Sequence, residues 1–146
     1  MGKSKMVPVE IKNHQEYIDI LNKLKEKTKY IILVQIDGYD EDDKIVAYAN
    51  SVMELEQKRE VRKWLGTITC GGKAVQYTYV ASKEFFKYLY GFSSFFFNTT
   101  SKRGEFQVID TEFGLDDIAF LDKEHNMLFY TTTHEGYANI EKGLLK

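Results

Sequence analysis

The sequence is poor in the residues that build cross-links and metal centres. Of its 146 residues one is cysteine (Cys70), one is proline and three are histidine. A single thiol cannot form an internal disulfide and cannot supply a zinc site built from several cysteines. The pair Gly71 and Gly72 is not followed by the Lys-Ser/Thr of a phosphate-binding loop. We therefore expect no disulfide framework, no bound metal and no cofactor, and Cys70 is interpreted as a structural thiol.

Long apolar runs are also missing. Apolar runs such as residues 30–34 and 95–97 fall far short of the roughly 20 residues that span a bilayer. Residues 1–6 are polar and basic, without the apolar region of a signal peptide. The net charge is −2, from 20 basic and 22 acidic side chains, which gives little attraction for nucleic acid or anionic lipid. We expect a soluble, cytoplasmic protein of bacterial style with neither a membrane nor a nucleic-acid partner.

Aromatic residues, in contrast, are abundant. The chain contains ten Phe and ten Tyr, and 43% of its residues are hydrophobic, which suits a packed core rather than a disordered chain. No repeat and no Gly/Ser-rich or Pro-rich linker divides it. We predict a single globular domain over residues 1–146, with residues 1–6 disordered and no prediction of the oligomeric state.

The first part of the chain has clear periodicity. An edge strand is predicted over residues 7–11, and Asn13 is a plausible N-cap for an amphipathic helix over 14–28. Residues 30–36 are β-branched and almost continuously apolar, which predicts a central strand buried on both faces. The most buried residues of this strand are expected to be Ile32, Val34 and Ile36.

Residues 43–60 are ambiguous. Ile45, Tyr48 and Val52 fit one face of a helix, whereas residues 44–50 alone could form a strand paired with 30–36. We prefer the helix over 43–60. The basic residues near its end alternate with glutamates and would then form a salt-bridged helical surface; these basic residues are Lys58, Arg59, Arg62 and Lys63.

Turn signals organise the rest of the chain. Gly71 and Gly72 separate two β-rich runs, residues 61–70 and 73–80, and predict a hairpin that contains Trp64, Ile68, Tyr77 and Tyr79. Ser82 is expected to cap a helix through Tyr90 that ends at Gly91. Further predictions are a strand at 106–110, a hairpin of 118–121 with 127–133 whose turn has Asn126 in the left-handed conformation, and a C-terminal helix at 136–145. This pattern indicates the α+β class: a mostly antiparallel sheet with a few helices packed on one side.

The first candidate site is aromatic. Eight aromatic residues lie between positions 85 and 97, and Phe85, Phe86 and Phe92 share one helical face with Leu89. They can be core residues with tyrosines covering the rim, or a partly exposed patch that anchors a partner. The candidate partner-binding residues here are Tyr88, Tyr90 and Phe96.

The second candidate is the segment 37–43, in which five of seven residues are acidic. The acids are Asp37, Asp40, Glu41, Asp42 and Asp43. Their spacing does not match the EF-hand calcium loop. The segment is interpreted as a solvated loop before a helix N-terminus or as an acidic face for a basic partner; a divalent-metal loop is the third alternative.

Catalytic candidates are weak. Residues 131–136 place three threonines beside His134 and Glu135 at a strand end, but the spacing of a zinc protease motif is missing. A hydrogen-bonded strand edge and helix cap is the preferred interpretation of these residues. Asp110 could assist His134, although it and the other acids of this region (Glu112, Asp116 and Asp117) are interpreted as solvated loop residues.

The surplus of aromatic and acidic residues favours binding over catalysis. We predict a small, non-enzymatic protein-binding module, of the inhibitor or immunity-protein type, that masks another protein. One alternative is a small hydrolase that uses His134 with Glu135 or Asp110. Another is a ligand- or nucleic-acid-binding module that uses exposed aromatic residues.

Overall fold

The computed structural model of the protein places most of the chain. The described residues are 6–36, 44–61, 63–64, 67–68, 74–92, 94–95, 97–100, 107–110, 117–132 and 137–145.

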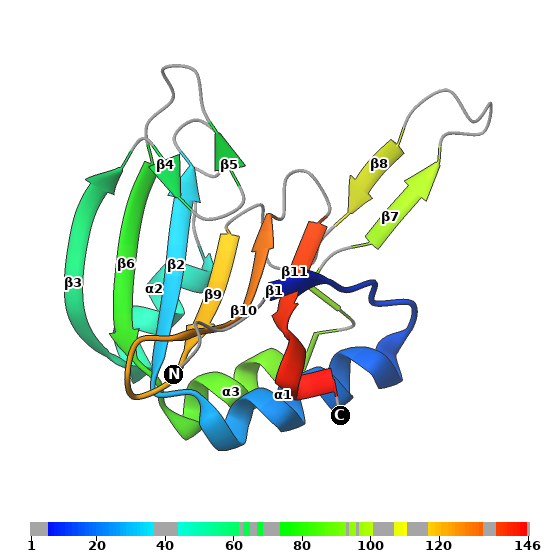
Figure 1. The fold of residues 1–146 in the computed structure, drawn as a ribbon. Coiled ribbons are helices and arrows are strands. Elements are labelled where there is room, and N and C mark those ends of the chain that lie inside the picture. The colour runs from blue at the N-terminus through cyan, green and yellow to red at the C-terminus, as the bar shows by residue number, and fades with distance from the viewer. Residues whose placement is uncertain are drawn as a thin grey trace.

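A seven-stranded antiparallel sheet forms the centre of the molecule (Figure 1). Its strand order is β1-β11-β10-β9-β2-β6-β3. The strands are β1 (Met6–Pro8), β2 (Tyr30–Ile36), β3 (Glu54–Val61), β6 (Ala74–Val80), β9 (Asp117–Leu121), β10 (Met127–Thr132) and β11 (Tyr137–Glu141). Two small two-stranded sheets accompany it, β4 (Lys63–Trp64) with β5 (Thr67–Ile68) and β7 (Phe97–Thr100) with β8 (Gln107–Asp110).

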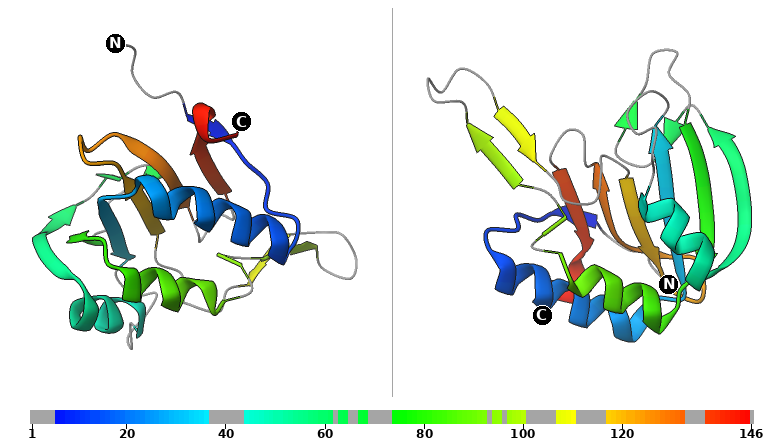
Figure 2. Two further views of the ribbon diagram at one scale, coloured as in Figure 1. Left: turned by 90° about the horizontal axis from the view of Figure 1, so that it is seen from below. Right: turned by 180° about the vertical axis from the view of Figure 1, so that it is seen from behind.

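Three α-helices cover one face of this sheet (Figure 2). They are α1 (His14–Lys27), α2 (Lys44–Val52) and α3 (Lys83–Tyr90), and the 3-10 helix η2 (Lys142–Leu145) follows the last strand. The main core lies between the helices and the sheet. The predicted α+β class, with helices on one side of an antiparallel sheet, is confirmed.

Local capping signals predicted two helices well. The Asn13 side chain accepts a hydrogen bond from the Glu16 N–H at 2.9 Å and begins α1. Ser82 accepts from the Phe85 N–H at 3.2 Å and begins α3. Each cap satisfies a backbone donor that the first helical turn leaves without a partner, so these boundaries depend on sequence-local chemistry.

Strand β2 is central, as predicted, between β9 and β6. The expectation that it is buried on both faces is confirmed only in part: on the face away from the helices Val34 is buried but Ile32 is not. Ile31 and Leu33 face the helices and are fully buried, whereas Ile32 is only half-buried. Val34 is buried in a second, small cluster on the other face, and the Ile36 side chain lies outside the described residues.

The preferred helix over 43–60 is correct only in its first half. Helix α2 ends at Val52, and residues 54–61 form the edge strand β3, paired with β6. The predicted salt-bridged helical surface is therefore wrong for Lys58 and Arg59, which lie in this strand. An edge strand is paired on one side only, and the residues of β3 other than Val61 are exposed, so it tolerates charge on both faces.

The hairpin predicted around the glycine pair has a different partner. Strand β6 pairs with β3, from Glu54 opposite Val80 to Val61 opposite Ala74, so of the described residues in the predicted strand 61–70 only Val61 pairs with it. Trp64 and Ile68 belong to the separate β4–β5 pair, while Gly71 and Gly72 lie outside the described residues.

The later hairpin is confirmed as β9–β10. However, the residue with a left-handed backbone in its turn is His125, with φ of 65°, instead of Asn126.

The C-terminal helix predicted at 136–145 is wrong over 137–141, which form β11. Ala138 and Ile140 are buried in the core while Asn139 between them is half-buried, which is the period of two that a strand requires. Strand β11 pairs with β10 on one side and with the short edge strand β1 on the other. Met6 belongs to β1, although it was expected to be disordered with residues 1–5, which lie outside the described residues.

Candidate functional site

The aromatic stretch divides into a buried part and a rim. Phe85, Phe86 and Leu89 of α3 are buried, and Phe95 after the helix is fully buried against Phe120 and Phe129, with ring centroids 6.2 and 5.1 Å away. These residues complete the core. The side chain of Phe96 lies outside the described residues.

Three half-buried rings on the helical layer form what we call the tyrosine cluster: Tyr48, Tyr88 and Phe92. The rings of Tyr48 and Tyr88 stack at 4.2 Å with an interplanar angle of 27°. Phe92 meets Tyr88 edge-on at 5.0 Å and 89°. The cluster thus joins α2 to α3, and its rings are held in position by one another before any partner binds.

Tyr90 has a different environment. Its hydroxyl donates a hydrogen bond of 2.6 Å to the side-chain oxygen of Asn22 on α1, and the Lys25 ammonium lies 5.8 Å from its ring centroid. Partial burial raises the pKa of the Tyr90 hydroxyl. These contacts join α3 to α1, so Tyr90 is less available to a partner than Tyr88.

Several other candidates follow strand ends in the chain. The acidic segment 37–43 follows β2, and His134 and Glu135 follow β10; all of them lie outside the described residues. Asp110 ends β8, but its side chain is outside the described part, as are Glu112, Asp116 and Cys70. Val34 is opposite Asp117 in the sheet, so the C-terminal end of β2 lies beside the start of β9.

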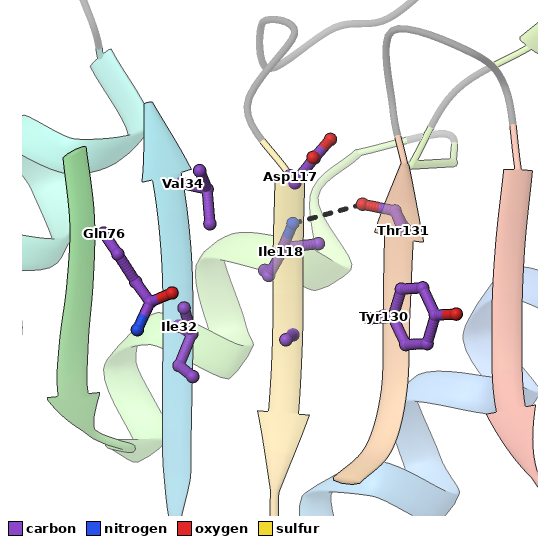
Figure 3. A pocket seen from close by; sticks show the side chains of 8 residues that line it. Ile32, Val34, Gln76, Asp117, Ile118, Tyr130 and Thr131 are labelled. Atoms are coloured by element: carbon purple, nitrogen blue, oxygen red, sulfur yellow. Dashed lines mark hydrogen bonds between the residues drawn. The ribbon is translucent and has the colours of Figure 1, made fainter. Parts of the chain in front are cut away.

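A hollow lies near these strand ends, on the sheet face opposite the helices (Figure 3). It has a volume of about 40 Å³. Apolar side chains of β2 and β9 form its floor, and side chains of β6, β9 and β10 supply polar groups. The described residues that line it are Ile32, Val34, Gln76, Asp117, Ile118, Ala119, Tyr130 and Thr131.

The hollow lies where the recorded pairing of β9 with β10 ends. The register of this pairing runs from Leu121 opposite Met127 to Ala119 opposite Tyr130. At the next position the Ile118 N–H donates instead to the side-chain hydroxyl oxygen of Thr131, at 3.1 Å (Figure 3). Thr131 is 1% exposed, so its hydroxyl keeps a buried N–H satisfied where a side chain replaces the backbone partner.

Asp117 is the residue that sequence reasoning misplaced. It was interpreted as a solvated loop acid, yet it is 3% exposed and is the first residue of β9. The available signal was its place in the alternation Asp-Ile-Ala-Phe-Leu, which puts residues 117 and 119 on one face. Burying a carboxylate is costly unless it has interaction partners, and Asp117 has at least one.

The turn of the β9–β10 hairpin carries a second polar group at the opposite end of the sheet. The His125 ring stacks on Tyr30 at 4.1 Å, and its Nε2 lies 3.8 Å from the Glu56 carboxylate on β3. The turn thereby contacts strands on both sides of β6. Both His125 and Glu56 are about half exposed, so this arrangement is a surface contact that holds the turn over the sheet.

Within the described residues no group of three or more His, Cys, Asp or Glu side chains is placed to hold a metal ion. None of the described helices is long and apolar enough to cross a membrane. Comparison with protein-family models, with curated proteins and with solved structures gives no match. Function must therefore be inferred from the residues themselves.

Proposed function

We propose that the protein is a non-catalytic binding module, of the inhibitor or immunity-protein type, that masks a basic protein partner. The observation that carries the proposal is the tyrosine cluster of Tyr48, Tyr88 and Phe92 on the helical layer. Aromatic side chains supply much of the binding energy of protein interfaces, and rings that are already ordered lose little entropy on binding.

The acidic segment that precedes α2 in the sequence supports a basic partner. Helix α2, which contributes Tyr48, begins at Lys44 directly after the acidic segment 37–43. Acidic residues beside an aromatic anchor accelerate encounter with a positively charged protein, whereas the desolvated rings slow dissociation. The two features therefore have separable effects on the association and dissociation rates.

The test is a binding series against a partner identified by mass from a pull-down in the native host. Tyr88→Ala should speed dissociation and weaken binding by on the order of 1–3 kcal/mol. Changing Asp40, Asp42 and Asp43 together to Asn should slow association and flatten its salt dependence. Tyr30→Ala is the matched control, because it removes a half-buried tyrosine that lies against His125 and not in the cluster.

His134→Ala separates binding from catalysis. It should leave the affinity unchanged, since the proposed surface does not use this residue. Loss of function in His134→Ala alone, with the acidic and Tyr88 variants intact, would refute the masking function and favour catalysis at the strand end.

A further inference from the structure

The hairpin turn between β9 and β10, residues 122–126, contacts β2 and, beyond β6, the edge strand β3. We propose that His125 in this turn is a pH-sensitive switch: protonation of its imidazole ties the turn to β3 through the Glu56 carboxylate, and loss of the proton releases it. Ile31 faces the helices, so Tyr30 and the ring stacked on it lie on the other face of the sheet. The proposal therefore concerns a different surface from the tyrosine cluster and does not depend on the masking function.

The backbone of the turn fixes the position of His125. The Asp122 N–H donates to the Asn126 carbonyl at 3.0 Å, and the His125 N–H donates to the Asp122 carbonyl at 2.9 Å. The Asp122 carboxylate accepts further hydrogen bonds from the Glu124 and Asn126 N–H groups, each at 2.9 Å. In this closed turn His125 has φ of 65°, a conformation for which Gly and Asn are the usual residues. The backbone therefore gives no particular reason for a histidine at this position, whereas the contacts of its ring do.

The His125 ring contacts an aromatic face and a carboxylate. It stacks on the Tyr30 ring with the centroids 4.1 Å apart and an interplanar angle of 16°. Its Nε2 lies 3.8 Å from Oε1 of Glu56. Figure 1 shows the turn, in orange, reaching across the lower ends of β2 and β6 toward the start of β3. Because the face of an aromatic ring carries partial negative charge, both contacts favour the protonated imidazole over the neutral one.

The other charged groups around the ring act in the same direction. Within the turn itself, the Asp122 carboxylate attracts the protonated His125 electrostatically. Strand β6, which separates β2 from β3, contributes the uncharged Val80 at this end of the sheet. Lys123 and Glu124, beside His125 in the turn, are exposed and opposite in charge, so their effects on the imidazole oppose each other. Among the described residues around the ring, the acids thus outnumber the bases and stabilise its charged form.

The direction and the size of the pH effect follow from these contacts. Histidine changes its charge between about pH 5 and 8. The contact with Glu56 therefore stabilises the turn while the imidazole is protonated, and this contribution is lost as the pH rises and the proton leaves. The side chains of His125 and Glu56 are 55% and 44% exposed. The effect is accordingly that of an exposed ion pair, about two- to fivefold in an equilibrium constant, and salt reduces it.

The experiment is a double-mutant cycle measured by urea unfolding at low salt, at pH 5.5 and at pH 8.5. Glu56→Gln removes the carboxylate and keeps the size of the side chain. His125→Asn removes the titrating ring and keeps a residue that tolerates the left-handed backbone. The cycle isolates the coupling between the two side chains from their other contacts. We expect a coupling of about two- to fivefold in the unfolding equilibrium constant at pH 5.5, and a coupling close to one at pH 8.5.

Amide hydrogen exchange measures the release of the turn itself. After correction for the intrinsic effect of pH on exchange, the protection of the Asp122 and His125 amides should fall about two- to fivefold from pH 5.5 to pH 8.5 in the wild-type protein. In Glu56→Gln it should stay constant. Glu54→Gln is the matched control, because it removes an exposed carboxylate from the same strand, and it should behave like the wild type in both measurements.

Three outcomes contradict the proposal. One is a coupling between His125 and Glu56 that is equally strong at both pH values, which would make the contact independent of the proton. Another is a coupling close to one at pH 5.5. The last is a Glu54→Gln variant that loses the pH dependence as completely as Glu56→Gln, which would show a general effect of charge on this edge of the sheet instead of a specific contact.

Discussion

The hydroxyl of Thr131 makes a contact whose removal should have a specific and measurable effect. Thr131→Val keeps the shape of the side chain but removes the acceptor of the Ile118 N–H, which lies 3.1 Å away in a buried environment. A buried donor without a partner costs about 1–3 kcal/mol. With a typical urea dependence of about 1–3 kcal/mol per molar, the unfolding midpoint should fall on the order of 1 M.

Thr131→Ser is the matched control because it retains the oxygen and loses a buried methyl group, a change of about 1 kcal/mol. Urea unfolding alone does not separate the two variants, but amide hydrogen exchange does. In Thr131→Val the Ile118 amide should exchange faster relative to that of Ala119, while in Thr131→Ser it should stay protected. Equal protection of Ile118 in wild type and Thr131→Val would refute the role assigned to this hydroxyl.

Two further predictions concern stability. Tyr17→Phe removes the buried hydrogen bond from the Tyr17 hydroxyl to the Leu89 carbonyl, which ties α1 to α3, and should lower the free energy of unfolding by about 1 kcal/mol in chemical denaturation. Partial burial raises the pKa of Asp122, but hydrogen bonds from the Asn126 and Glu124 backbones outweigh it, so the folded pKa lies below the ordinary 3.8. The stability from Asp122 is therefore present above that value and is lost as the pH falls through the folded pKa. The difference in unfolding free energy between wild type and Asp122→Asn should shrink on acidification, and a constant difference would contradict this assignment.

Features that depend on neighbouring residues could be predicted from the sequence. The N-caps Asn13 and Ser82 lie directly before their helices, and the side-chain bonds they make span three residues. Strand β2 was predicted from its β-branched composition. Such signals are contained in the segment itself, so no knowledge of the rest of the fold is needed.

Features that depend on distant partners could not be predicted in the same way. The charges of β3 fit a helix surface equally well, and its pairing with β6 decides the outcome. Residues 137–141 are too few to distinguish a period of two from a helical one until β10 and β1 are placed beside them. The choice between the faces of β2 likewise depends on which face the helices cover.

The candidate site shows the same limit. Tyr88 was identified from the aromatic stretch, but its stacking on Tyr48, which lies 40 positions earlier in the sequence, is a tertiary contact. Asp117 was misassigned because its neighbours in the sequence, Glu112 and Asp116, are acidic and suggest a solvated loop. Its burial is a consequence of its position in β9 opposite Val34.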